Sequence, residues 1–162
     1  METELLKINL GCGMRKLEGY LNIDIREECN PDVIMDVEKG LYMHDDTVDE
    51  IKAFDFMEHI RQSKVVYVLS EIHRVLKEGG VFHFFIPSTE GVGAFMDPSH
   101  RSYWNVCSFL YFVHPEWHKL YPTWPFFKVI EQIRQIRTMP ELNIIHVEGK
   151  ITPVKGENHD HA

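Results

Sequence analysis

The stretch INLGCGMRKLEGYLNIDI, residues 8–25, decides the fold of this chain. It begins in a segment that alternates apolar and polar residues, which predicts a strand. Gly11 and Gly13 follow, and glycines at this place let the backbone turn sharply and approach a ligand closely. A second short strand ends near Asp24, whose carboxylate can accept hydrogen bonds from both hydroxyls of a ribose. The stretch therefore predicts a nucleotide site at the ends of two strands, with an ordinary tight turn as the alternative.

Short strands and one long helix fill the rest of the chain. The helix is expected from Ser63, as its N-cap, to about Lys77, because apolar residues recur there at helical spacing and two glycines follow. A short helix is expected over residues 55–60. Two late alternating segments predict an antiparallel hairpin around a turn at residues 138–140. The segments expected as strands are residues 5–10, 20–25, 32–35, 48–54, 80–86, 126–137 and 142–152.

This order of elements predicts an α/β fold with a mostly parallel sheet and an antiparallel C-terminal hairpin. Residues 14–20 and 26–31 are too short for the helical crossovers that normally connect parallel strands. We therefore expect the helices between strands 1 and 2 and between strands 2 and 3 to be missing, together with a helix before strand 1. Polar residues at alternate strand positions, such as Lys7, Glu50 and His83, agree with a sheet that has one bare face.

The composition predicts one globular domain in this chain of 162 residues. We expect the domain over residues 1–155, a substrate lid within it over residues 88–122, and a polar tail over residues 156–162. A net charge of −8 argues against a broad nucleic-acid surface, and neither a spanning apolar run nor a signal-peptide pattern indicates a membrane protein. The three cysteines lack a CxxC spacing, which favours free thiols and a cytoplasmic location.

Six segments agree in order and spacing with one enzyme family. They are NLGCG, NIDI, DVEKGL, DDTVDEI, FDFMEHI and EIHRVLKEGGVFHFFIP, and together they resemble a class I S-adenosylmethionine-dependent methyltransferase of the small type 11 group. The resemblance covers Leu5 to about Pro87. It implies a Rossmann-like sheet, S-adenosyl-L-methionine as the cofactor, and methyl transfer as the activity.

The resemblance also implies roles for individual residues. The turn after strand 1 would face the methionine part of the cofactor with its backbone. Asp24 would hold the ribose with Ile25 beside the adenine, and Asp36 would take the adenine amino group. Phe54 would help to close the pocket, although the family often has a small polar residue at this place. The implied cofactor-binding residues are Leu10, Gly11, Cys12, Gly13, Asp24, Ile25, Asp36, Val37, Phe54 and Asp55.

The acceptor site is expected in the aromatic segment of residues 90–112, which departs from the parallel pattern. Asp97 and His100 are the candidate catalytic residues, and His100 is the candidate base. A rigid Asp-Pro-Ser-His turn, with purely local hydrogen bonds, is an equal alternative. Tyr103 and Trp104 either sandwich an acceptor or belong to the core.

No metal ion is expected, because the methyl group of this cofactor is already activated and mainly needs to be aligned with a nucleophile. His114 and His118 have the i, i+4 spacing of a metal pair, but no third ligand is evident. His59 lies four residues after Asp55, and its side chain either points into the cofactor cleft or packs against its own helix. The histidines of the C-terminal tail are interpreted as part of a solvated segment.

These inferences predict methyl transfer to a small-molecule, sugar-like or peptide acceptor. The alternative is a methyltransferase-like scaffold or regulatory protein that keeps the cofactor pocket, or a relic of it, without activity. An NAD or nucleotide-sugar enzyme is disfavoured because Lys16 stands where a dinucleotide fingerprint needs its third glycine. The net charge disfavours a nucleic-acid methyltransferase. The bare sheet face is expected to meet water, the aromatic lid, or a partner such as a second copy of the chain.

Overall fold

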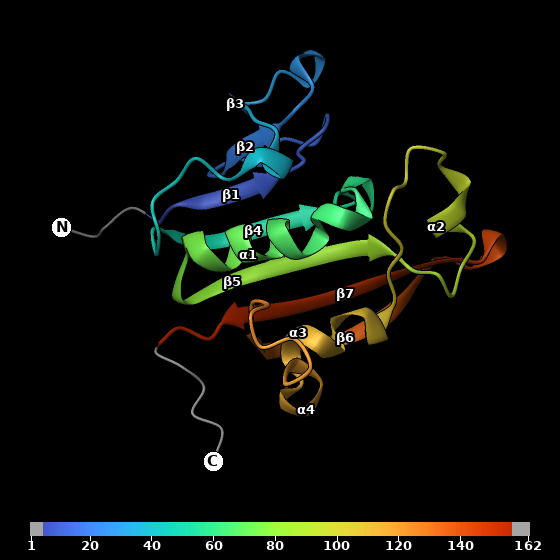
Figure 1. Cartoon of the computed structure of the whole chain (residues 1–162). Helices are drawn as coiled ribbons and strands as arrows, with labels where there is room; N and C mark the ends of the chain where they lie inside the picture. The colour runs from blue at the N-terminus through green and yellow to red at the C-terminus, as the bar shows by residue number, and fades with distance from the viewer. Residues whose placement is uncertain (1–4, 157–162) are drawn as a thin grey trace.

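A single sheet of seven strands organises the computed structural model, which describes residues 5–156 (Figure 1). The strand order is β3-β2-β1-β4-β5-β7-β6. The first five strands of this order run parallel, while β7 pairs antiparallel with both β5 and β6. The predicted mostly parallel sheet with an antiparallel C-terminal hairpin is therefore confirmed. The strands are β1 (Lys7–Leu10), β2 (Leu21–Asp24), β3 (Val33–Ile34), β4 (Val48–Phe54), β5 (Leu76–Pro87), β6 (Phe127–Met139) and β7 (Ile144–Pro153).

Helices in the described residues are short, and the longest is α1 (Val65–Val75). The predicted short helix after β4 is a single 3-10 turn, η3 (Met57–His59). The other helices are α2 (Gly93–Met96), α3 (Leu110–Val113) and α4 (Pro115–His118), with the 3-10 turns η1 (Glu27–Cys29), η2 (Val37–Lys39), η4 (Gln62–Lys64), η5 (Val106–Phe109) and η6 (Pro140–Leu142).

Helix α1 lies within the predicted bounds but begins and ends differently. The predicted N-cap at Ser63 is wrong, because Ser63 belongs to η4 and Lys64 precedes α1 without a side-chain capping hydrogen bond. The helix ends at Val75, before its predicted end, because Leu76 adopts extended backbone and pairs with Val48 as the first residue of β5. Strand pairing therefore ends this helix, rather than the glycines that follow.

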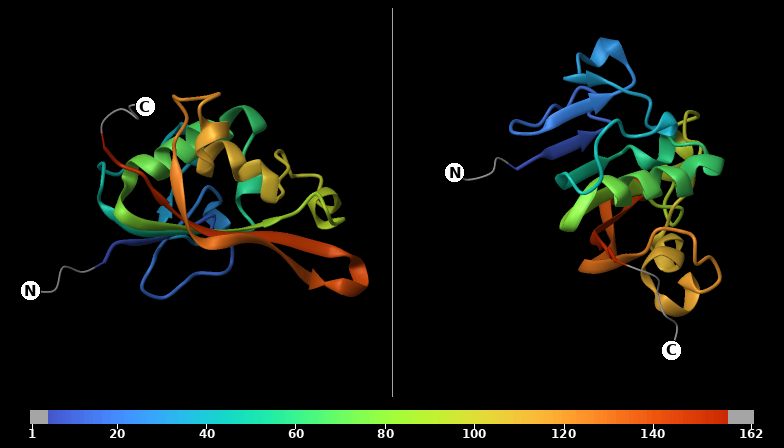
Figure 2. Two further views of the ribbon diagram at one scale, coloured as in Figure 1. Left: turned by 90° about the horizontal axis from the view of Figure 1, so that it is seen from below. Right: turned by 60° about the vertical axis from the view of Figure 1, so that its left-hand side comes forward.

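The helices α1, α3 and α4 lie on the same side of the sheet (Figure 2, left). No helix connects β1 to β2, and only the turn η1 lies between β2 and β3 within residues 5–156. The expected loss of these two crossover helices is confirmed. The opposite face of the sheet has no helical layer in the part of the chain that the structure describes.

The core fills the space between the sheet and this helical layer. Phe84 of β5 is fully buried and stacks on Phe109 of η5 with 4.1 Å between the ring centroids. Leu69 and Ile72 of α1 are also buried to 1% exposure or less. Trp104 belongs to the same core at 3% exposure, so it is a packing residue rather than an acceptor platform.

The bare face of the sheet carries polar side chains that pair across strands. Tyr20 donates a hydrogen bond from its hydroxyl to Glu50 at 2.7 Å, and the Lys52 ammonium lies 4.7 Å from the centre of the Tyr20 ring. His83 and Glu148 make a 3.1 Å contact from β5 to β7. These contacts join polar side chains of neighbouring segments without a covering helix, in agreement with the polar alternation in the sequence.

The connection between β3 and β4 is tied to helix α1 by Arg74. Its guanidinium donates hydrogen bonds of 2.8 Å to the carbonyl oxygens of Leu41 and Met43. It also pairs with Glu71 at 2.7 Å and with Asp45 at 2.6 Å. One side chain therefore fixes the loop that leads into β4.

We expect Arg74→Ala to lower the free energy of unfolding by about 2–3 kcal/mol, because several charge-assisted hydrogen bonds are lost together. For a domain of this size the loss lowers Tm by about 5–10 °C in a thermal melt. Arg137→Ala is the matched control, since Arg137 is exposed on β6, and it should change stability by less than about 0.5 kcal/mol. Equal melting temperatures for the two variants would contradict this role of Arg74.

Candidate functional site

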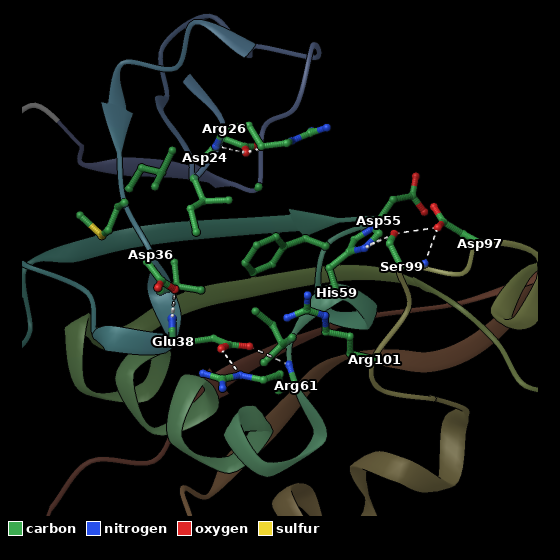
Figure 3. Close-up of a pocket in the computed structure, with 17 residues that line it drawn as sticks. Asp24, Arg26, Asp36, Glu38, Asp55, His59, Arg61, Asp97, Ser99 and Arg101 are labelled. Atoms are coloured by element: carbon green, nitrogen blue, oxygen red, sulfur yellow. Dashed lines mark hydrogen bonds and ion pairs between the residues drawn. The ribbon is translucent and has the colours of Figure 1, made fainter. Parts of the chain in front are cut away.

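A cavity of about 760 Å³ opens at the carboxyl ends of β1, β2 and β4 (Figure 3). This volume is in the range of small-molecule sites, and its position is where open α/β sheets hold their ligands. Five acidic residues and three arginines contribute to the wall, together with apolar side chains. The apolar members are Ile23, Ile25, Met35, Val37, Phe56 and Ile60.

The glycine turn after β1 forms one end of this wall. Gly11 and Gly13 have positive φ angles of 68° and 49°, which side-chain-bearing residues rarely adopt. The backbone N–H groups of Gly11 and Cys12 both donate to the carbonyl oxygen of Ile23, at 2.8 and 2.9 Å. Because Ile23 belongs to β2, these bonds fix the turn to the neighbouring strand without a helix.

Phe56 packs directly on Gly11. A Cβ atom at Gly11 would lie 2.6 Å from Cγ and 2.9 Å from Cβ of Phe56, and closer still to Cδ2. Both residues line the cavity, so the Phe56 ring stands on the open side of the glycine. The missing side chain at Gly11 is therefore a spatial requirement as well as a conformational one.

Asp24 at the end of β2 is held as an ionised carboxylate. Its Oδ2 accepts the backbone N–H of Gly13 at 2.8 Å, and its Oδ1 accepts the backbone N–H of Arg26 at 2.9 Å. Burial alone would raise the pKa of Asp24, but the two N–H donors and the Arg26 guanidinium outweigh burial and lower this pKa. The side chain lines the cavity and keeps acceptor capacity for a ligand's hydroxyl groups.

Asp36 and Val37 form the wall beyond β3. Asp36 caps η2 by accepting the backbone N–H of Glu38 at 3.1 Å, and it pairs with Lys39 at 3.2 Å. Val37 is 5% exposed and continues an apolar surface from Met35. An acid beside an apolar wall suits a flat heterocycle that has an exocyclic amino group.

Asp55 occupies a strained position where β4 ends. Its φ angle is 50°, in the left-handed region, although it is not a glycine. Its carboxylate pairs with His146 at 3.2 Å and lies 3.7 Å from Arg15. The backbone N–H of Asp55 donates to the Phe85 carbonyl at 2.8 Å, which fixes the turn that places Asp55 at the cavity.

Asp97, Ser99 and His59 form a hydrogen-bonded series along the opposite wall (Figure 3). The Ser99 hydroxyl donates to Oδ1 of Asp97 at 2.7 Å and lies 3.2 Å from Nδ1 of His59. Because the only hydroxyl proton of Ser99 points to Asp97, Nδ1 of His59 must be the donor in the second contact. His59 therefore keeps an unprotonated Nε2.

Burial lowers the pKa of His59, and the neighbouring His100 lowers it further. The imidazole is consequently neutral near pH 7, with a free lone pair on Nε2. His59 is also the one imidazole among the described residues that line the cavity. It is the side chain best placed to meet a substrate at this end.

His100 and Glu58 lie behind His59. The rings of His59 and His100 meet edge to face at 5.1 Å, and Nε2 of His100 lies 4.0 Å from Oε1 of Glu58. Nδ1 of His100 is 2.8 Å from the carbonyl oxygen of Ala94, so this nitrogen carries the proton. Glu58 is 2% exposed, and burial raises its pKa to about 8.

The structure brings most of the sequence-predicted site residues to one cavity. Leu10 and Cys12 are buried in or beside the core, and Gly13 contributes its N–H to Asp24. Phe54 lies on the bare face, with its ring 4.7 Å from His83, and His100 lies behind His59. The predicted residues that line the cavity are Gly11, Asp24, Ile25, Asp36, Val37, Asp55 and Asp97.

Several lining residues were not predicted from the sequence. Arg26 and Phe56 line the cavity, but only the residues directly before them, Ile25 and Asp55, were predicted to bind the cofactor. His59 was considered as a residue of the cleft but was not selected as a site residue. Ser99 was visible only as part of the Asp-Pro-Ser-His turn, and its contact with His59 spans 40 positions in the sequence.

The lining fits a nucleoside with a polar tail. A glycine turn with positive φ angles, a buried carboxylate at a strand end, and an acid beside an apolar wall supply the three kinds of contact that it needs. The Phe56 ring limits the space at Gly11.

Comparisons with known proteins agree with this geometry. Residues 10–84 match the family model described as a methyltransferase domain. An S-adenosylmethionine-dependent methyltransferase from Methanosarcina mazei has a TM-score of 0.63 at 14% identity, and the match covers 93% of each chain. One from Mesorhizobium loti has a TM-score of 0.59 at 16% identity, covering 92% of this chain and 91% of that chain.

A third solved structure contains ligands. The 1,6-didemethyltoxoflavin-N1-methyltransferase from Burkholderia thailandensis was solved with 1,6-didemethyltoxoflavin and S-adenosylhomocysteine bound. Its TM-score is 0.61 at 12% identity, and the match covers 93% of this chain and 71% of that chain. At these identities the solved structures show a shared fold. A search of curated proteins finds no match.

Proposed function

Residues 10–84 of this chain carry a class I S-adenosylmethionine-dependent methyltransferase domain of type 11, and we propose that the protein methylates a small acceptor bound beside His59. One observation carries the proposal. The glycine turn and the ionised Asp24 meet at one end of a cavity whose opposite wall presents a neutral histidine. Cofactor and acceptor would thus meet in one cavity.

S-adenosylmethionine, when bound, supplies a methyl group that its sulfonium centre has already activated. The chain's task is to align a nucleophile with this methyl group and to exclude water. Asp24 would accept hydrogen bonds from the ribose hydroxyls, and Asp36 would accept one from the adenine amino group. Ile25 and Val37 would pack against the adenine. Gly11 and Gly13 would let the backbone approach the amino-acid part of the cofactor.

The acceptor would occupy the end of the cavity formed by His59, Ser99 and Asp97. Its nucleophilic atom would face the Nε2 lone pair of His59, while Asp97 holds His59 through Ser99. Asp97 and His100 are then positioning residues for His59. A neutral amine acceptor reacts by alignment alone, whereas a hydroxyl acceptor must also lose its proton.

A small acceptor suits the size and the charge of the site. The cavity of about 760 Å³ is shared with a cofactor, and its surroundings carry more acidic than basic groups. The relative from Burkholderia thailandensis acts, by its name, on 1,6-didemethyltoxoflavin, which is also a small molecule. In residues 5–156, no helix has both the length and the apolarity required to cross a bilayer.

The Phe56 ring favours a second candidate function, a scaffold protein without activity. If this ring stays on Gly11, the amino-acid part of the cofactor cannot approach the turn. Calorimetric titration with S-adenosylhomocysteine, followed by a turnover assay, separates the two functions. Conversion of S-adenosylmethionine to S-adenosylhomocysteine with members of a panel of small amines and hydroxyl compounds supports the enzyme. The absence of S-adenosylhomocysteine binding, or binding without turnover on any member, supports the scaffold.

We expect His59→Gln to lower kcat about 100-fold on the acceptor found in that panel, because the neutral nitrogen that meets the acceptor is lost. The dissociation constant of S-adenosylhomocysteine should change less than about twofold, since the cofactor contacts lie at the other wall. His44→Gln is the control, because His44 is exposed and does not line the cavity. A kcat equal to that of the wild type would exclude His59 from the acceptor site.

A further inference from the structure

We propose that Glu58, His59 and His100 form a binding site for a divalent transition-metal ion, with Zn²⁺ as the best match to these ligands. Each residue offers one ligand atom, and these atoms lie within 4.8 Å of one another. Glu58 and His59 belong to η3, while His100 comes from the segment after α2. No sequence spacing indicates this cluster, because His100 lies 41 positions after His59.

Glu58 provides the first line of evidence. Its side chain is 2% exposed, and its Oε2 atom is buried without a hydrogen-bond partner in the described residues. A buried carboxylate oxygen without a partner costs free energy, and proteins usually compensate such oxygens by hydrogen bonds or by a metal ion. One nitrogen of each imidazole lies within 4.8 Å of a Glu58 carboxylate oxygen, so a cation bound among the three groups would give the carboxylate a partner.

The two histidines provide the second line of evidence. In metal sites a histidine ligand normally donates its other ring N–H to a carbonyl or carboxylate, which fixes the tautomer. Nδ1 of His100 is 2.8 Å from the Ala94 carbonyl, and Nδ1 of His59 contacts Ser99, which in turn donates to Asp97. Both rings therefore keep Nε2 unprotonated and available. Nε2 of His100 is the atom that lies 4.0 Å from Glu58.

Two imidazoles and one carboxylate are a ligand set of metal sites that keep an open coordination position. Zinc binds such atoms at about 2.0–2.2 Å, so the three side chains must move inward by about 1 Å from their present spacing. The side of the cluster that faces the cavity is the wall formed by His59. The open position would therefore point toward the acceptor.

The consequence for chemistry rests on the proposed function, whereas ion binding itself does not. A cation at this position lowers the pKa of a hydroxyl group or water that binds to it. A hydroxyl acceptor bound to the ion could then release its proton to solvent water near pH 7, even though the lone pair of His59 is occupied by the ion. The site would thus favour acceptors with an oxygen nucleophile.

Calorimetric titration of the full chain with Zn²⁺, and absorption spectroscopy with Co²⁺, test the site without cofactor or acceptor. His159 and His161 lie outside the described residues and offer the same type of ligand atom, so a variant carrying His159→Gln and His161→Gln serves as the reference protein. We expect one Zn²⁺ per chain in this reference. Adding Glu58→Gln or His100→Gln should weaken binding at least about 100-fold, whereas adding His44→Gln should leave it unchanged.

Folding is checked by circular dichroism, and His59→Gln replaces any variant of the cluster that fails to fold. No zinc binding by the reference protein, or zinc binding that survives the substitutions in the cluster, would overturn the metal site. The binding of S-adenosylhomocysteine is measured separately. If the cofactor binds and zinc does not, the metal site fails while the proposed function stands. If zinc binds and the cofactor does not, the proposed function fails alone.

Discussion

Gly11→Ala is expected to destabilise the protein by about 3 kcal/mol and to abolish detectable binding of S-adenosylhomocysteine. The new Cβ would lie 2.6 Å from Cγ of Phe56, and the φ angle of 68° is strained for any residue other than glycine. The Phe56 ring would have to move into the cavity or the turn would have to open. A thermal melt should show a Tm that is lower by about 6–12 °C. Titration calorimetry should detect no heat of binding for S-adenosylhomocysteine.

Gly19→Ala separates the two causes of this effect. Gly19 has a similar φ angle of 75°, but among the described residues no heavy atom beyond its own chain neighbours lies within 4 Å of the place where its Cβ would stand. Its substitution should therefore cost about 1 kcal/mol, which is the backbone strain alone. The double variant Gly11→Ala with Phe56→Ala should regain part of the lost stability. Equal stabilities for Gly11→Ala and Gly19→Ala would show that Phe56 does not pack on the turn.

Asp24→Ala is expected to weaken the binding of S-adenosylmethionine about 1000-fold, because two charge-assisted hydrogen bonds to the ribose hydroxyls are lost. The N–H groups of Gly13 and Arg26 would also lose their acceptor, which loosens the turn beside the cofactor. Titration calorimetry measures the affinity, and Asp24→Asn should lie between the wild type and Asp24→Ala. This intermediate variant keeps the shape of the side chain and removes the charge.

Asp32→Ala is the matched control for this prediction. The Asp32 carboxylate also accepts a strand backbone N–H, from Asn22 at 2.8 Å, and pairs with Lys16 at 2.6 Å. It does not line the cavity, so its loss should lower stability while the folded protein keeps its cofactor affinity. If Asp32→Ala weakened binding as much as Asp24→Ala, the effect of Asp24 would be structural and the ribose contact would be excluded.

The fold was largely predictable because its determinants are local. The alternation of polar residues such as Lys7, Glu50 and His83 predicted a bare sheet face, and the structure has no helix on it within residues 5–156. The short connection after Gly13 left no room for a crossover helix. Helix boundaries were less predictable, since the end of α1 depends on the pairing of Leu76 with Val48, which is a tertiary contact.

The candidate site was predictable where it follows strand ends. Asp24 is the last residue of β2, while Asp36 and Asp55 come shortly after β3 and β4, and all three line the cavity. The wall formed by His59, Ser99 and Asp97 was harder to predict from the sequence. The contact from Ser99 to His59 and the packing of Phe56 on Gly11 connect distant segments of the chain. Such contacts leave no periodic signal in a single sequence, and only the folded chain brings them together.

The missing crossover helices do not remove the contacts that a cofactor needs. The N–H groups of the turn are fixed by the carbonyl oxygen of Ile23 and by the Asp24 carboxylate, both of which belong to the adjacent strand. The bare face is compensated by cross-strand pairs such as Tyr20 with Glu50. The edge of the sheet that we propose as the cofactor site is therefore built from strands and turns alone.

Titration calorimetry of the wild-type chain with S-adenosylhomocysteine tests this central claim most directly. The geometry of the turn, Asp24 and the apolar wall predicts one site per chain with a dissociation constant of about 1–100 µM. Saturation of the chain at one equivalent would support a working cofactor site in a sheet without crossover helices on one face. The absence of binding at millimolar ligand would contradict it, and with it the proposed methyl transfer.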